Sequence, residues 1–77
     1  MSPKLPRITG AEVIRALRRA GWYPNYQHGS HVYLRHPSYP NMRVTVPVHP
    51  GTTIKPKTLQ TILKQADVSI SEFQELL

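Results

Sequence analysis

The sequence lacks cysteine and has only four acidic residues among its 77. Without cysteine, neither a disulfide nor a thiolate metal site can hold the fold together, so its stability has to come from packing. The chain has no apolar run long enough to span a membrane, and its first residues lack the apolar segment of a secretory signal. We therefore expect a small cytoplasmic domain that does not associate with membranes.

The scarcity of carboxylates also limits the chemistry. Glu12 and Glu72 each follow a hydroxyl residue by three positions, a spacing that predicts a role in capping helices. Asp67 and Glu75 fall at a predicted helix end and on the last predicted helix. No carboxylate remains for the central strands or their loops, which argues against a two-metal nuclease and against a carboxylate general acid. We expect neither a metal nor a cofactor.

Basic residues, in contrast, are abundant. Ten Lys and Arg residues give a formal net charge of +6, which favours a polyanionic partner. They are spread over several predicted elements and do not line one face of a strongly apolar helix, so nucleic acid is favoured over a membrane surface. A basic surface that serves only solubility is the simpler alternative, because net charge alone defines no reaction.

The hydrophobic pattern predicts helices at both ends and three strands between them. Thr9 and Glu12 form a capping box, and the helix that follows extends to Ala20, with Gly21 as its stop. Its apolar face contains Val13 and Leu17, while Arg15, Arg18 and Arg19 form a solvated face or a patch for phosphates or a partner. Strands are predicted over 22–28, 31–36 and 43–48, joined by a Gly29-Ser30 turn and a turn-rich loop over 37–41.

The C-terminal part completes the predicted fold. Pro56 begins a second amphipathic helix that ends near Asp67, and Ser69 begins a short third helix. The order α-β-β-β-α-α predicts a two-layer α+β fold, in which a three-stranded antiparallel sheet has its helices on one face. Residues 1–8 are predicted to be a flexible lead-in, and residues 9–77 a single domain.

His31 is the strongest catalytic candidate. Metal-free RNA cleavage needs a base for the 2′-hydroxyl proton, an acid for the leaving 5′-oxygen and cations near the charged phosphorane. His31 opens a strand directly after a tight turn and shares the polar strand face with Tyr33, a candidate for stacking on bases. A tolerated surface histidine is the simpler alternative. Trp22 is expected in the core.

Neighbouring residues extend this candidate site. Ser30 would support His31, the turn amides could bind a phosphate, and His49 could be a second proton carrier if the loops meet. A zinc site built from His28, His31 and His36 is disfavoured, because no cysteine or carboxylate completes it. The residues predicted to bind RNA are Gly29, His28, Tyr33, Arg35, Lys55, Lys57 and Lys64.

An ordered set of short motifs resembles one protein family. The motifs are Ala20-Gly21-Trp22, Gly29-Ser30-His31, Tyr33, His36-Pro37, Val46-Pro47, His49, Lys55-Pro56-Lys57-Thr58-Leu59, Ile62-Leu63-Lys64-Gln65-Ala66 and Ser71-Glu72-Phe73. From about residue 9 onward, the chain resembles the HicA family, the small mRNA interferase toxins of HicA–HicB toxin–antitoxin pairs. Two positions depart from the family pattern: His28, where Lys or Arg is frequent, and Asp67, where Gly is common.

The resemblance implies a fold like a double-stranded-RNA-binding domain. It also implies the toxin of a type II system, an endoribonuclease that cuts mRNA and arrests growth with His31 as the essential histidine. The implied partner is a HicB antitoxin, which masks the active site and helps to repress the operon. A non-catalytic RNA-binding module of the same fold is the alternative, since it explains the charge and the element order equally well. A small adaptor for an acidic protein is a third possibility.

Overall fold

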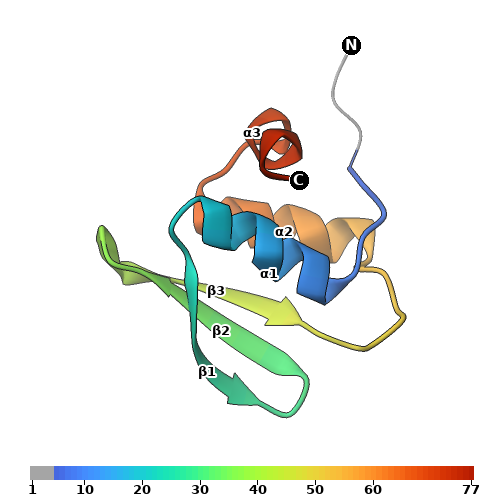
Figure 1. Ribbon diagram of the computed structural model, residues 1–77, viewed down its shortest axis with the longest axis horizontal. Helices are drawn as coiled ribbons and strands as arrows, with labels where there is room; N and C mark the ends of the chain where they lie inside the picture. Colours follow the sequence, from blue (N-terminus) through green and yellow to red (C-terminus); the bar gives the residue numbers. More distant parts are fainter. Residues whose placement is uncertain (1–4) are drawn as a thin grey trace.

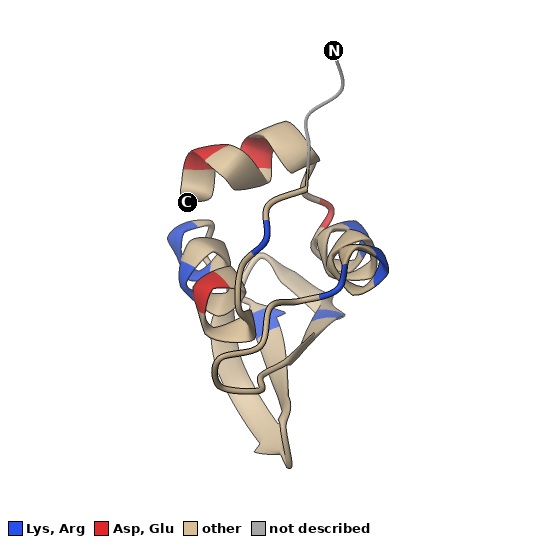
Figure 2. Ribbon diagram, turned by 90° about the vertical axis from the view of Figure 1, so that its right-hand side faces the viewer, with Lys and Arg blue, Asp and Glu red and all other residues tan. Residues whose placement is uncertain are grey.

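The computed structural model describes residues 5–77, and in them two of three helices, α1 and α2, cover one face of a three-stranded sheet (Figure 1). The elements are α1 (Gly10–Arg19), β1 (Tyr23–His28), β2 (His31–His36), β3 (Tyr39–Pro47), α2 (Pro56–Ala66) and α3 (Ile70–Leu76). The strands are antiparallel in the order β1-β2-β3. Figure 2 shows α3 above α1 and α2, on the side away from the sheet. The predicted α+β class is confirmed, and the arrangement is consistent with a double-stranded-RNA-binding-domain-like fold.

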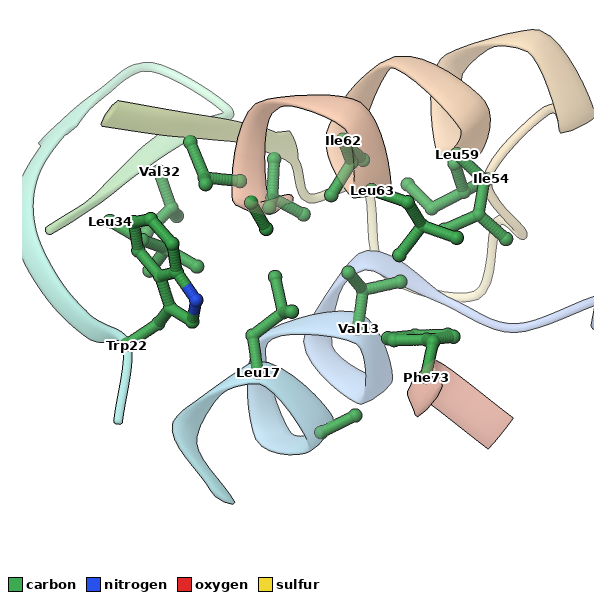
Figure 3. Packing of buried hydrophobic residues seen from close by; sticks show 14 residues of the cluster. Val13, Leu17, Trp22, Val32, Leu34, Ile54, Leu59, Ile62, Leu63 and Phe73 are labelled. Atoms are coloured by element: carbon green, nitrogen blue, oxygen red, sulfur yellow. The ribbon is translucent and has the colours of Figure 1, made fainter. Parts of the chain in front are cut away.

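Most of the core lies between the sheet and the two helices α1 and α2, and Phe73 of α3 belongs to the same buried cluster (Figure 3). Alternation places Val32 and Leu34 of β2 on the helix side of the sheet, where both side chains are buried. Trp22 is only 3% exposed, which confirms its predicted place in the core. The buried apolar residues are Val13, Ala16, Leu17, Trp22, Val32, Leu34, Val44, Val46, Ile54, Leu59, Ile62, Leu63, Ala66 and Phe73.

α1 is fixed at both ends as the sequence predicts. The Thr9 side chain accepts a hydrogen bond from the Glu12 amide at 3.3 Å, and the Glu12 carboxylate accepts one from the Thr9 amide at 3.0 Å. Gly21 follows the C-cap with φ +100°, a left-handed conformation that suits glycine. At the start of the helix, buried Gly10 packs directly on the backbone of Pro47 and Val48. α1 is therefore seated on the end of β3.

The prediction of a loop over 37–41 is wrong. β3 begins at Tyr39, which pairs with His36, so only Pro37 and Ser38 form the turn. Pro40 suggested a loop, but it is tolerated because β3 is an edge strand and its pairing with β2 is irregular between Leu34 and His36. A second irregularity interrupts β1 between Pro24 and Tyr26. Both edge strands thus contain a proline and a break in register.

The outer edge of β3 is partly closed. The Thr45 amide donates to the Gln65 side chain of α2 at 3.0 Å, whereas the Val48 amide points away from the outer edge, toward the β1–β2 hairpin, and donates to the Ser30 carbonyl at 2.7 Å. Pro47 has the same strand parity as Thr45, so its nitrogen, which carries no hydrogen, faces the outer edge. Pro47 therefore lies where β3 has no neighbouring strand on its outer side.

The remaining segments are tied to the helices. Residues 1–4 of the predicted lead-in lie outside the described residues, while Leu5 and Ile8 pack against the core and the Ile54 amide donates to the Ile8 carbonyl at 2.7 Å. Asp67 ends α2 with φ +54°. Arg19 of α1 donates to the backbone oxygens of Leu76 and Leu77 at 2.6 and 2.9 Å and thereby holds the end of α3. Over residues 5–77, the helices are too short or too polar to cross a bilayer.

Candidate functional site

The predicted Gly29-Ser30 hairpin forms as expected. His28 and His31 are direct cross-strand partners, so the loop between them has two residues. Gly29 has φ +59°, as the first central residue of a type II′ turn requires, and its carbonyl accepts a hydrogen bond from the Gln27 side chain at 3.1 Å. His31 is exposed on the sheet face that no described helix covers. The hairpin therefore presents His28 and His31 side by side to solvent.

The loop after β3 lies beside this hairpin. His31 pairs with Pro47, and the bond from the Val48 amide to the Ser30 carbonyl extends this contact to the residue before His49. His49 and Lys55 line one hollow of about 180 Å³, together with Thr58 in the first turn of α2. Lys55 makes no side-chain cap to α2, so the first amides of the helix are open to an anion. Ser30, His31, His49 and Lys55 thus gather at one end of the sheet.

A second hollow, of about 350 Å³, lies on the open sheet face. Its lining includes His28, Tyr33 and Arg35, three of the residues predicted to bind RNA. Tyr26 stacks on Tyr33, with ring centroids 5.8 Å apart and planes inclined by 26°. Arg43 lies over the ring of Tyr33, with its guanidinium carbon 4.9 Å from the ring centroid.

Sequence reasoning did not select Tyr26 or Arg43 for this site. Both were assigned to strands, but only the register between the strands brings them to Tyr33. The predicted antiparallel meander already implied that Tyr33, on the middle strand, has a cross-strand neighbour on each side, but it did not identify these neighbours.

The side chains of Arg35 and His36 form hydrogen bonds with the backbone and so help to hold the fold together. The Arg35 guanidinium makes long hydrogen bonds to the carbonyls of Pro40 and Met42, at 3.4 and 3.3 Å, and so supports the irregular start of β3. His36 accepts the Ser38 amide on Nδ1 at 3.0 Å, and its Nε2 lies 2.9 Å from the Ala20 carbonyl. Because a carbonyl only accepts, the proton of His36 is on Nε2.

The surroundings of His36 explain two of the sequence motifs. Its ring lies 5.2 Å from that of Trp22, and a Cβ on Gly21 would come within 2.5 Å of its Nε2. The Ala20-Gly21-Trp22 and His36-Pro37 motifs therefore meet in one structural contact. Among residues 5–77, no group of three or more His, Cys, Asp or Glu side chains is close enough to hold a metal ion.

The basic residues of the helices fall into separate groups. Lys57 is exposed in the first turn of α2, near Lys55, whereas Lys64 lies at the far end with Asp67 and Glu72. Nine residues of helix, roughly 13 Å, separate Lys55 from Lys64, so the structure does not bring Lys64 to the histidines. On α1, the arginines Arg15, Arg18 and Arg19 line an exposed hollow of about 430 Å³ with Ala11 and Ile14.

Acidic residues are confined to the helical layer. Residues 13–66 contain no Asp or Glu, and in Figure 2 no position drawn red lies on the strands. Hydrogen bonds from Thr9 lower the pKa of Glu12 below its ordinary value of 4.5, and those from Ser69 lower the pKa of Glu72 in the same way. Both carboxylates are helix caps. The open sheet face thus combines aromatic rings and positive charge without a carboxylate from the described chain.

Comparison with models of known protein families identifies a matching family. A family model described as the HicA toxin of bacterial toxin–antitoxin systems matches residues 10–68 of the 77-residue chain. The matched segment begins with α1 and ends just after α2, so it contains the whole sheet and both hollows beside His31. A search of curated proteins found no match.

Proposed function

The chain belongs to the HicA family, toxins of bacterial toxin–antitoxin systems, and on this basis we propose that it is an endoribonuclease that cleaves mRNA and so arrests growth. The observation that carries the proposal is the position of His31. It is exposed, directly follows a two-residue turn and lies beside the loop that holds His49. Histidine changes its protonation near neutral pH, and acid–base cleavage of RNA depends on that property.

In the proposed mechanism, His31 acts in proton transfer. As the base, it takes the proton of a ribose 2′-hydroxyl, and the 2′-oxygen attacks the adjacent phosphorus. The bond from phosphorus to the 5′-oxygen breaks, the leaving oxygen takes up a proton, and a 2′,3′-cyclic phosphate remains. His49 or a water molecule supplies that proton. The turn amides of Gly29 and Ser30 orient the phosphate, and Lys55 and Lys57 stabilise its negative charge.

The proposed partners follow from the same assignment. The substrate is mRNA in the cytoplasm, and a HicB-like antitoxin masks the face that contains His31. A non-catalytic RNA-binding module of the same fold is the competing function, because it requires the same charge and the same strand order. Only a cleavage assay separates the two.

The test is to incubate the purified chain with mRNA in EDTA beside His31→Ala and His49→Ala. We expect cleavage by the wild type, and a rate about 10²–10⁴ lower for His31→Ala, the usual contribution of a general acid or base. A strand of 2′-deoxynucleotides is the matched control and should stay intact, because it lacks the attacking oxygen. His49→Ala tests which group protonates the leaving oxygen. Slower cleavage by this variant would assign the proton to His49, and an unchanged rate would assign it to water.

Three results contradict parts of this proposal. If the wild type leaves RNA intact, or if His31→Ala cuts equally fast, the catalytic assignment fails and the binding module is favoured. If EDTA stops cleavage, the metal-free mechanism fails. Products with a 5′-phosphate in place of a 5′-hydroxyl would exclude attack by the 2′-oxygen.

A further inference from the structure

We propose that the open face of the sheet holds one unpaired nucleobase of the RNA, stacked in the hollow around Tyr26 and Tyr33. This inference rests on the proposed function for the identity of the nucleic acid. It goes beyond that function in naming a base-binding subsite, the residues that form it and a preference for single strands.

The first argument is the arrangement of flat groups. Each strand contributes one: Tyr26 from β1, Tyr33 from β2 and Arg43 from β3. The planes of the two tyrosine rings are inclined by 26° with centroids 5.8 Å apart, and the guanidinium carbon of Arg43 lies 4.9 Å from the Tyr33 ring centroid. Tyr26 is nevertheless 59% exposed as a residue, so its side chain remains accessible from solvent. A nucleobase could stack on such a surface, as bases do on aromatic rings and guanidinium groups in single-strand-binding proteins.

The second argument is the chemistry of the hollow. Its volume of about 350 Å³ lies within the usual range for small-molecule sites. The lining includes Asn25, whose amide can both donate to and accept from a base edge, and His28, whose ring nitrogens can do the same. Arg35 and Arg43 supply positive charge, and no described residue of the lining is acidic. The hollow therefore suits a flat polar group attached to a phosphate backbone.

The third argument is the position of the hollow relative to the candidate catalytic residue. His28 lines the hollow and is the cross-strand partner of His31. The Cβ atoms of directly opposed residues in an antiparallel pair are about 5 Å apart. A nucleotide whose base lies on Tyr26 and Tyr33 can thus extend its sugar and phosphate toward the hairpin and His31.

This geometry discriminates between RNA forms. In an A-form duplex each base is stacked and paired inside the helix, and a protein meets mainly phosphates, sugars and the shallow minor groove. A base can lie flat in the hollow only when it is turned out of such a stack. The subsite therefore selects unpaired RNA, although the fold resembles one associated with double strands.

The test is a binding measurement in which no cleavage can occur. The probes are a fluorescent single-stranded oligodeoxyuridylate, the same sugar–phosphate chain without bases, and a 2′-O-methyl RNA duplex of equal length, which keeps the A-form. Because these probes lack the 2′-hydroxyl, fluorescence anisotropy reports affinity alone. We expect the wild type to bind the base-bearing strand more tightly than the abasic strand and the duplex.

Variants assign the difference to the hollow. Tyr26→Ala should weaken binding of the base-bearing strand by roughly 5- to 150-fold, the usual effect of losing one base–aromatic stack, and leave abasic binding unchanged. Tyr26→Phe should bind like the wild type, because stacking needs the ring and not the hydroxyl. Tyr23→Ala is the matched control, since Tyr23 is an exposed tyrosine of the same strand (44%) outside the lining. Circular dichroism checks that each variant is folded.

Three outcomes overturn the inference: equal affinity for base-bearing and abasic strands, equal effects of Tyr26→Ala and Tyr23→Ala, or equal affinity for single strands and duplex. Each of these outcomes would mean that the hollow binds no nucleobase and instead contacts a protein partner or has no ligand. These failures are distinct from failure of the proposed function. Base-dependent binding without any RNA cleavage contradicts only the nuclease, and cleavage with base-independent binding contradicts only the subsite.

Discussion

Replacing Gly10 by alanine tests how tightly α1 is seated on the end of β3. A Cβ at this position would overlap the Pro47 carbonyl oxygen and lie 3.1 Å from both the Pro47 carbonyl carbon and the Val48 Cα. These are backbone atoms, so no side-chain rotation relieves the contact, and either the helix or the strand end has to move. Overpacking of this kind costs about 1–3 kcal/mol, and a backbone clash belongs in the upper part of that range.

Helix propensity works in the opposite direction. Alanine is favoured over glycine by at most about 1 kcal/mol in a helix, so the net destabilisation expected for Gly10→Ala is about 1–2 kcal/mol. For a domain of this size, that corresponds to a fall in Tm of about 5–15 °C. Thermal unfolding followed by circular dichroism measures it.

The control is Ala11→Gly, at the exposed neighbouring position. It should destabilise the chain by at most about 1 kcal/mol, so alanine is the better residue at position 11 and glycine at position 10. Because Val48 is bonded to Ser30, Gly10→Ala should also slow RNA cleavage, by up to about 100-fold, at temperatures where the variant is still folded. A variant that melts at or above the wild-type temperature would refute the close packing of α1 on β3.

Two further predictions concern stability. Asp67→Gly should stabilise the chain by about 1 kcal/mol, because Asp67 has φ +54° and glycine adopts this conformation without steric cost; chemical denaturation measures it, and an unchanged midpoint would argue against strain. The lowered pKa values of Glu12 and Glu72 mean that their caps add stability above pH 4.5, and that this contribution is lost as the pH falls below 4.5 toward the folded-state values. Glu72→Gln keeps an acceptor for the Ser69 amide without titrating, so melting curves at decreasing pH should show a smaller loss of stability than in the wild type; an equal loss would contradict this role.

The local elements could be predicted because their signals are short-range. The capping boxes at Thr9 and Ser69, the stop at Gly21 and the turn at Gly29 each depend on side chains or φ angles within a few residues. Apolar alternation then assigned one face of the sheet to the core. The fold class followed from these elements and their order.

The composition of the site was harder to predict because it depends on strand register. The irregularity in β1 shifts its pairing by one residue before Tyr26, and the start of β3 is shifted further. Alternation alone does not reveal such shifts, so Tyr26 and Arg43 were not recognised as neighbours of Tyr33. The contact of Arg35 with the Met42 carbonyl and that of His36 with the Ala20 carbonyl were also beyond sequence reasoning, because each depends on a backbone carbonyl of a neighbouring segment.

The outer edge of β3 determines how another chain can approach the molecule. A strand added there would meet Pro47, which has no hydrogen to donate, and the Thr45 amide, which is already bonded to Gln65. The sheet therefore resists continuation into a second molecule on this side, which disfavours edge-to-edge aggregation as well as recognition by strand addition. An antitoxin that masks His31 as proposed, without pairing at this edge, and that lies across the open face would cover the same rings that we assign to RNA, so antitoxin and substrate would compete for one surface.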